Sequence, residues 1–342
     1  MKKTVLLLVA IIAMCLSASA YKTTAVLLDH NGTITTYEAI NIQTAMDDAV
    51  DNDVIFLNEG IFPGFTITKK ISVKGLGMNT IISGDVRIVM PNDPINDETV
   101  LIEPILEYLY IQKRIIVPEN SFPIRGLKIK QCQCNGISLY TMIYDSYIDR
   151  CYIAGYYVGL DGYYTYNGLY IGKEKVINID GYNIYYEPYV NGLTVVNSRI
   201  DNVYSTSSSN CNATFINCHI IEFGGSGFVK NSIISSTKYR STHACYARFL
   251  YCYYDSGASF GSTCEISRCY ERENVEGKNF MEYDSQDIVA NGYLGDDGTL
   301  IGPLGGNTPY TLIPAIPKVT DGKLSVDPQK QQLNVTLTIS PK

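Results

Sequence analysis

A short phrase of alternating apolar and polar residues recurs along the chain, and most copies carry a serine or cysteine near their end. The clearest copies are LKIKQCQC, YIDRCYI, TVVNSRI, TFINCHI, FVKNSII, RFLYCYY and EISRCYE, between residues 127 and 271. Alternation of this kind is the period of a β-strand and not of a helix. Because turn residues and no helices separate these short strands, the pattern excludes repeated βαβ units.

The serine or cysteine returns at intervals typical of stacked repeats. Positions 198, 218, 232, 252 and 269 are separated by 20, 14, 20 and 17 residues. The sequence therefore predicts an all-β protein, a right-handed parallel β-helix (solenoid) over residues 21–290. Small Ser and Cys side chains would form a ladder within it from about residue 127 to 269. Buried cysteines pack as small hydrophobes, and no C-x-x-C pair predicts a metal site.

Both ends of the repeat region depart from its pattern. Residues 38–50 read EAINIQTAMDDAV and predict a short amphipathic capping helix. Its apolar face would carry Ile42, Ala45, Met46, Ala49 and Val50. Residues 291–342 begin with a Gly-rich stretch and continue with the strand-like runs TLIPAIPKV and QLNVTLTIS. We expect a C-terminal cap or small β appendage there.

The first twenty residues have the three parts of a signal peptide. Lys2 and Lys3 are followed by an apolar run, residues 5–16, and by the small residues Ala18-Ser19-Ala20. The run is too short for a bilayer span, which needs about 20 residues. We expect cleavage after Ala20 and an exported chain, located in the periplasm, on the outer surface or in the medium, with no membrane span in its mature part.

Charge and cysteine content narrow the possible partners. Removal of Lys2 and Lys3 takes the net charge from −7 to −9, which argues against nucleic acid as a partner. Without Cys15, nine of the ten cysteines remain, an odd number that leaves at least one unpaired within the chain. Export permits disulfides, but the sequence leaves their pairing and the oligomeric state open.

One segment near the N-terminus resembles a known family. The pattern I-Q-x-A-x-x-x-A…V-I-F-L…G-x-F…I-T-K-K-I-S-V-K-G-x-G is similar to the opening of the pectate-lyase-like right-handed β-helix superfamily. The resemblance covers roughly residues 37–285 and is strongest over 42–84. The phrase D-G-x-x-x-G-x-x-G-G-x-x-P-Y, residues 297–310, resembles a C-terminal feature of secreted β-helix proteins of Bacteroidetes-type bacteria. This superfamily hosts enzymes, adhesins and non-catalytic proteins, so the resemblance implies a fold and no single activity.

The catalytic signatures of that superfamily are absent from the repeats. Glycoside hydrolysis needs two clustered carboxylates, but N-T-D, D-D, G-H-G and R-I-K do not occur there, nor do the lyase phrases W-x-D-H and R-x-P-x-x-R. The acidic pairs Asp47-Asp48 and Asp296-Asp297 are interpreted as solvated helix-surface and turn charges.

A basic stretch is the weak candidate for catalysis. Lys238, Arg240, His243 and Arg248 lie within eleven residues, and Arg268 and Arg272 follow further along the chain. If stacking brings them to one face, they could bind an acidic sugar through charge-assisted contacts, with Ca²⁺ as the cofactor of a lyase. The alternative is an outward turn with scattered solvated charges. No other cofactor is expected.

Tyrosine is concentrated in the middle of the chain. Fourteen of the 28 tyrosines lie between Tyr140 and Tyr189, and Trp is absent. Adjacent residues of a strand point to opposite faces, so several of these rings must face outwards, where they could pack on sugar rings. The candidate ligand-binding residues are Tyr156, Tyr157, Tyr163, Tyr164, Tyr166, Tyr185 and Tyr186. Tyrosine also tolerates half-exposed strand positions without any ligand.

These observations predict an exported, non-catalytic β-helix protein that binds a polysaccharide, a cell-surface glycan or another surface ligand. The first alternative is a polysaccharide lyase, or another carbohydrate-active enzyme, acting on an acidic glycan through the basic stretch. The second is a structural or adhesive solenoid without a small ligand.

Overall fold

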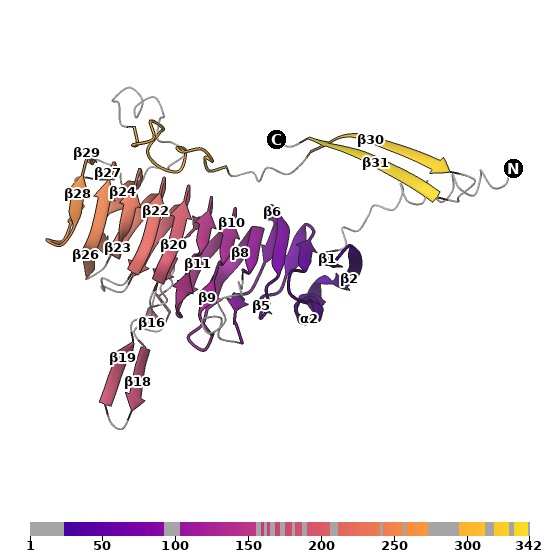
Figure 1. Cartoon of the computed structure of the whole chain (residues 1–342), viewed down its shortest axis with the longest axis horizontal. Coiled ribbons are helices and arrows are strands. Elements are labelled where there is room, and N and C mark those ends of the chain that lie inside the picture. Colours follow the sequence, from indigo (N-terminus) through magenta and orange to yellow (C-terminus); the bar gives the residue numbers. More distant parts are fainter. Residues whose placement is uncertain are drawn as a thin grey trace.

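The computed structural model is an all-β protein, with 59% of its residues in strands and 5% in helices (Figure 1). Within the part of the chain that the structure describes, no helix is both long and apolar enough to cross a membrane. The predicted signal peptide lies outside the described residues. These are residues 24–91, 103–154, 159–160, 163–164, 168–171, 175–179, 182–186, 190–205, 211–239, 242–255, 258–272, 294–311, 318–327 and 332–340.

Nine parallel strands close into a barrel. The pairing runs from β8 through β10, β13, β20, β22, β23, β21, β17 and β11 and returns to β8, with every step parallel. In that order the bounds are Ile105–Val117, Lys128–Lys130, Tyr147–Asp149, Val190–Val196, Cys211–Ile216, His219–Lys230, Arg199–Ser205, Gly168–Ile171 and Gln133–Leu139.

Two long strands close this ring because each of them pairs with different neighbours along its two halves. The first residues of β8 pair with β10 and its later residues pair with β11. In the same way, β23 pairs first with β21 and then with β22. Tyr108 of β8 has a φ of 59°, and Gly225 and Gly227 of β23 have φ values of 118° and 149°. These positive φ values let each strand change direction without ending.

The predicted right-handed parallel β-helix is therefore wrong, although the all-β class is confirmed. The prediction assumed short strands that end at every turn. Instead, β8 and β23 are 13 and 12 residues long and continue through their bends, so that the pairing closes into a nine-stranded barrel with outer strands. The alternation of apolar residues within a strand carries no information about such closure.

The remaining parallel strands lie outside the ring, and most of them extend it at its two ends (Figure 1). They are β3 (Val54–Leu57), β4 (Gly60–Phe62), β5 (Phe65–Ile67), β6 (Ser72–Ile82), β7 (Val86–Ile88), β9 (Ile124–Arg125), β12 (Ile143–Tyr144), β14 (Tyr152–Ile153), β24 (Ile233–Ser236), β26 (Thr242–Leu250), β27 (Tyr253–Asp255), β28 (Glu265–Ser267) and β29 (Tyr270–Arg272).

Antiparallel pairs are mostly between strands that are neighbours in sequence. They join β1 (Ala25–His30) to β2 (Thr33–Glu38) and to β3, β15 (Gly159–Leu160) to β16 (Tyr163–Tyr164), β18 (Lys175–Ile179) to β19 (Tyr182–Tyr186), β25 (Lys238–Tyr239) to β26, and β30 (Lys318–Asp327) to β31 (Gln332–Ser340).

The helical segment near the N-terminus is shorter than the predicted range of 38–50. A 3₁₀ turn, η1 (Ala39–Asn41), leads into α2 (Ile42–Asp48), which packs on β1 and β5. Ile42, Ala45 and Met46 are buried in α2, as the apolar pattern predicts. Val50 is 48% exposed because the chain leaves the helix at Ala49, whose backbone is extended.

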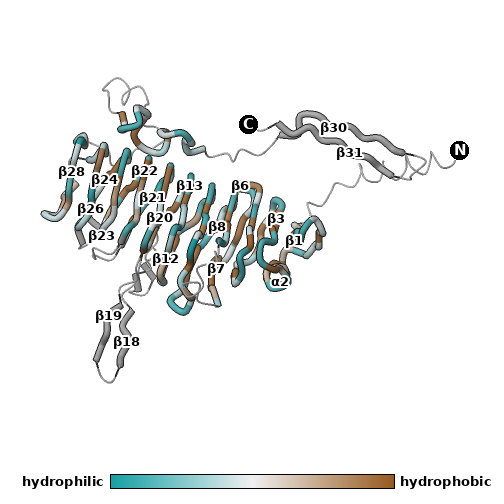
Figure 2. The backbone as a smooth tube through the Cα atoms, viewed as in Figure 1, coloured by the Kyte–Doolittle hydropathy of each residue, from teal (hydrophilic) through white to brown (hydrophobic). Residues whose placement is uncertain are grey.

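One continuous apolar core fills the interior of the parallel strands. Apolar and polar residues alternate along the strands (Figure 2), so that one face of each strand contributes to this core. Towards the C-terminal end the core contains four phenylalanines in edge-to-face contact. The ring centroids of Phe215, Phe223, Phe249 and Phe260 are 5.7, 5.6 and 4.9 Å apart along this chain of contacts.

Candidate functional site

The predicted ladder of serine and cysteine is present, and hydrogen bonds connect its steps. Its members are Cys132, Cys151, Ser198, Cys218, Ser232, Cys252 and Cys269. The Cys151 N–H donates to Ser198 Oγ at 3.0 Å, and the Cys218 N–H donates to Ser232 Oγ at 3.0 Å. Each hydroxyl or thiol also donates to the carbonyl two residues before it. Small side chains with a donor are therefore needed at this corner.

A second ladder of polar side chains lies one residue earlier, and all its members have a left-handed backbone. We call it the turn ladder: Gln131, Arg150, Asn197, Asn217, Asn231, Tyr251 and Arg268, with φ between 46° and 52°. Asn accepts this conformation more readily than other non-glycine residues. The conformation is shared by all seven members, so it belongs to the repeated corner itself.

Two asparagines of the turn ladder hold the segment 294–311, which we call the tail segment. Asn197 Nδ2 donates to the Pro303 and Gly305 carbonyls at 3.1 and 2.7 Å. Asn231 exchanges two hydrogen bonds with Asp296, at 2.9 and 3.2 Å, and its carbonyl accepts from the Gly302 N–H at 2.8 Å. The tail segment is thus fixed to the outer side of the corner.

Apolar contacts and an ion pair complete this attachment. Ile301 and Tyr310 of the tail segment are buried in a small cluster with Ile233 and Tyr253. Lys230 Nζ lies 2.6 Å from Asp296 Oδ2, which lowers the pKa of that carboxyl. The tail segment therefore packs against the parallel strands and is not a free appendage.

We predict that Gly305→Ala detaches the tail segment. A Cβ at Gly305 would lie 1.7 Å from the Leu300 carbonyl oxygen, a backbone atom that cannot move aside cheaply. Amide exchange in residues 300–306 should become about tenfold faster or more. Hydrogen–deuterium exchange measures this directly.

Gly298→Ala is the control, because its Cβ would meet no atom within 4 Å. Its positive φ of 73° adds only about 1 kcal/mol of backbone strain. Equal exchange rates in the two variants would contradict the packing described for Gly305.

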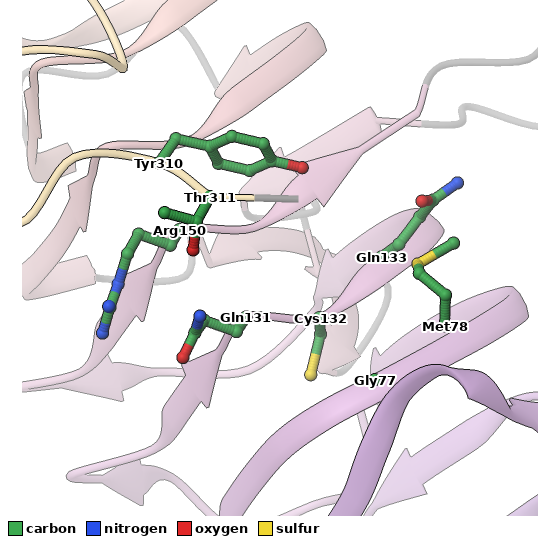
Figure 3. A pocket seen from close by; sticks show the side chains of 8 residues that line it. All are labelled: Gly77, Met78, Gln131, Cys132, Gln133, Arg150, Tyr310 and Thr311. Carbon is green, nitrogen blue, oxygen red and sulfur yellow. The ribbon is translucent and has the colours of Figure 1, made fainter. Parts of the chain in front are cut away.

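A small, solvent-open hollow lies where the tail segment ends (Figure 3). It is lined by residues from four separate parts of the chain: Gly77, Met78, Gln131, Cys132, Gln133, Arg150, Tyr310 and Thr311. Gln131 and Arg150 continue the turn ladder beyond its asparagines, but their longer side chains reach into the wall of the hollow.

Gln131 supplies a hydrogen-bond donor that nothing in the described part of the chain satisfies. Its Nε2 atom is buried and has no partner there. A buried unpaired donor costs about 1–3 kcal/mol, and most such atoms in native proteins are paired. A rotation of the Gln131 amide towards the hollow would let a ligand oxygen supply the missing partner.

The charge of Arg150 is compensated within the protein. Its Nε and Nη2 atoms donate to Asp149 Oδ2 at 3.0 and 2.7 Å. Partial burial alone would lower the pKa of Arg150, but the hydrogen bond and the charge of Asp149 outweigh it and raise the pKa. The Arg150–Asp149 pair therefore adds little net charge to the wall of the hollow.

The other titratable groups in the wall remain neutral. Burial raises the pKa of the Tyr310 hydroxyl to about 12 and that of the Cys132 thiol to about 12. The Cys132 sulfur also points away from Tyr310 in the close-up view (Figure 3). Among the described lining residues none is a carboxylate or a histidine. The wall thus supplies hydrogen-bond donors and no ready general base or nucleophile.

Two tyrosines flank the hollow on the same face of the sheet as Gln133. Tyr110 and Tyr152 pair directly with Gln133 from the strands on either side, so their side chains lie on its face. Both are partly exposed, and the Arg199 guanidinium lies 5.0 Å from the Tyr152 ring centre. Aromatic rings next to amide donors form a surface suited to sugar rings.

Of the basic residues predicted for catalysis, only Arg248 has a described side chain. Arg248 is 68% exposed and pairs at 2.8 Å with Glu265, which is 72% exposed. The backbones of Lys238 and His243 pair across β25 and β26, but the side chains of both lie outside the described residues, as does all of Arg240. Where its side chains are described, this stretch forms an exposed ion pair, and its catalytic role remains a prediction.

The tyrosines predicted to bind a ligand are largely outside the described residues. This applies to the whole of Tyr156, Tyr157 and Tyr166. Tyr163 and Tyr164 lie on β16, and Tyr185 and Tyr186 on β19, but only their backbones are described. Their role remains a prediction.

The two acidic pairs have local partners. Asp48 accepts from the Tyr37 hydroxyl and Asp47 from Gln43 Nε2. Asp296 pairs with Lys230, and Asp297 accepts from Thr299. In the described residues no three His, Cys, Asp or Glu side chains gather as a metal site.

The fold is that of an all-β protein with a small polar hollow at one corner. No protein-family model, curated protein or solved structure matches the chain. The resemblance to the pectate-lyase-like superfamily thus gains no support from these comparisons.

Proposed function

We propose that this chain is an exported, non-catalytic protein that binds a neutral glycan in the hollow bounded by Gln131, Arg150 and Tyr310. The observation that carries the proposal is the buried Nε2 donor of Gln131, which has no partner among the described residues. Sugar hydroxyls are abundant acceptors that could satisfy it.

The surroundings of this donor favour a neutral ligand. Asp149 already neutralises Arg150, and the chain as a whole is negative, so an acidic polymer would gain little and be repelled at long range. Tyr110 and Tyr152 supply rings on which a sugar could pack. The absence of a carboxylate or histidine among the described lining residues supports binding over catalysis.

The proposal predicts that Gln131→Met weakens binding while leaving the fold intact. Methionine keeps the length of the side chain but removes the donor, so a panel of neutral oligosaccharides should bind about 3- to 10-fold more weakly. Isothermal titration calorimetry on the mature chain measures this. The matched control is Gln112→Met, the same change at an exposed glutamine that does not line the hollow.

Three results would contradict this proposal. Equal affinities in the two variants would place the ligand elsewhere. Binding to none of the panel would instead favour a structural or adhesive role. Release of unsaturated products from uronic-acid polymers, read as ultraviolet absorbance, would favour the lyase.

A further inference from the structure

Two cysteines at the C-terminal end of the ladder lie directly opposite each other on neighbouring strands. Leu250 pairs with Ser267 and Tyr253 pairs with Tyr270, which places Cys252 opposite Cys269. Neighbouring strands are about 4.8 Å apart, within the Cα separation of about 4.4–6.8 Å that a disulfide spans. The Cα separation of the two cysteines therefore lies within the range that a disulfide spans.

Hydrogen bonds also connect the two cysteines. The Cys252 N–H donates to Cys269 Sγ at 3.3 Å, and a hydrogen bond joins the two side chains. Cys252 is fully buried, whereas Cys269 is only partly buried and so can be reached from solvent.

We propose that Cys252 and Cys269 are a thiol pair that closes into a disulfide by exchange with an external disulfide such as oxidised glutathione. Cys269 is the attacking sulfur and Cys252 the resolving one. The chemistry does not depend on glycan binding. In the cell this reaction requires an oxidising compartment, so its occurrence there rests on the proposed export of the chain.

The roles follow from the surroundings of each sulfur. The hydrogen bond from Cys252 lowers the pKa of the Cys269 thiol, against the effect of its burial, while burial raises the pKa of Cys252. Thiolates, not thiols, attack disulfides. The more accessible Cys269 is therefore the better nucleophile.

The exchange has two balanced steps. The Cys269 thiolate attacks one sulfur of glutathione disulfide, forming a mixed disulfide and releasing one glutathione thiolate. Cys252 then gives up its proton to that thiolate or to water and attacks Cys269 Sγ. This forms the Cys252–Cys269 bond and releases the second glutathione, so two protein thiols are oxidised as one disulfide is reduced.

A second thiol pair in the same ladder provides an internal control. Cys132 lies opposite Cys151 in the same way, since Lys130 pairs with Asp149 and Gln133 with Tyr152. Both of these thiols are at most 2% exposed, and burial raises the pKa of both. We expect this pair to stay reduced under the same conditions.

The test treats the reduced, folded mature chain with oxidised glutathione, blocks the remaining thiols and maps peptides by non-reducing mass spectrometry. The expected product is a pair of peptides linked through Cys252 and Cys269, with a mass two hydrogen atoms below the sum of the two reduced peptides. Wild type and Cys264→Ser should both give this product. Cys252→Ser should stop at a glutathione adduct on Cys269, and Cys269→Ser should leave Cys252 reduced. Serine is tolerated here, since Ser198 and Ser232 occupy the same ladder position.

Three results would overturn the proposal: linkage of Cys269 to Cys264, a stable glutathione adduct on Cys269 in the wild type, or no modification of Cys269. Oxidation of the Cys132–Cys151 pair at an equal rate would also contradict it, because burial would then play no part. Glycan binding measured on the oxidised and on the reduced chain shows whether the glycan site is intact, whatever the outcome for the cysteines.

Discussion

Phe223→Ala is expected to lower the free energy of unfolding by about 3–5 kcal/mol. Phe223 is fully buried and contacts Phe215 and Phe249 edge-to-face. It lies on β23, one of the two strands that close the ring. Truncation would leave a cavity at the centre of this aromatic chain, because its neighbours are held by their own strands. Urea unfolding followed by circular dichroism measures the loss.

Phe122→Ala is the matched control, since Phe122 is 43% exposed. The same chemical change there should cost at most about 1 kcal/mol. If the two variants lost equal stability, the packing of the four phenylalanines would not be as described.

Acidification from pH 7 to about pH 4.5 is expected to lower the free energy of unfolding through His219 by about 2–3 kcal/mol. His219 is fully buried on β23, and burial, together with the charge of Arg199, lowers its pKa to about 3. In the unfolded chain the pKa of histidine is about 6.5. The folded state therefore keeps His219 neutral while the unfolded state takes up a proton.

The direction follows from these two pKa values. The contribution of neutral His219 to stability is fully present above about pH 6.5 and is lost as the pH falls from there towards 3. Urea unfolding at both pH values measures it. His219→Gln should remove most of this difference, whereas His30→Gln, at a residue with a 53% exposed side chain, should retain it. An unchanged pH difference in His219→Gln would contradict the assignment.

The repeat pattern predicted the local structure well because it reflects short-range chemistry. A Ser or Cys that donates to the carbonyl two residues earlier needs a small side chain at every corner, so the spacing of 198, 218, 232, 252 and 269 was visible in the sequence. The buried face of α2 was visible for the same reason, because its apolar residues recur at helical spacing.

Closure of the ring could not be predicted in this way. It depends on whether a strand ends at a corner or continues through it, as β8 does at Tyr108 and β23 does at Gly225 and Gly227. Alternation of apolar residues is the same in both cases. The β-helix was therefore the wrong choice between architectures that share the same strand pattern.

The hollow was also missed, because its residues are distant in sequence and individually ordinary. Gln131, Arg150 and Tyr310 meet only because the tail segment returns to the corner. One signal could have found two of them. The residue before each Ser or Cys of the ladder is polar or tyrosine. At Gln131 and Arg150 this residue has a longer side chain than the asparagines that hold the tail segment. The basic stretch drew attention because charges cluster in its sequence, yet Arg248 forms an exposed ion pair.

The most direct test of the proposed glycan site is hydrogen–deuterium exchange of the mature chain with and without the oligosaccharide that binds most tightly. We expect slower exchange in residues 131–133, around Arg150 and at 310–311, with little change elsewhere. Slower exchange confined to the tyrosine-rich region, residues 156–186, would contradict the assignment of the hollow and favour the tyrosines as the binding surface.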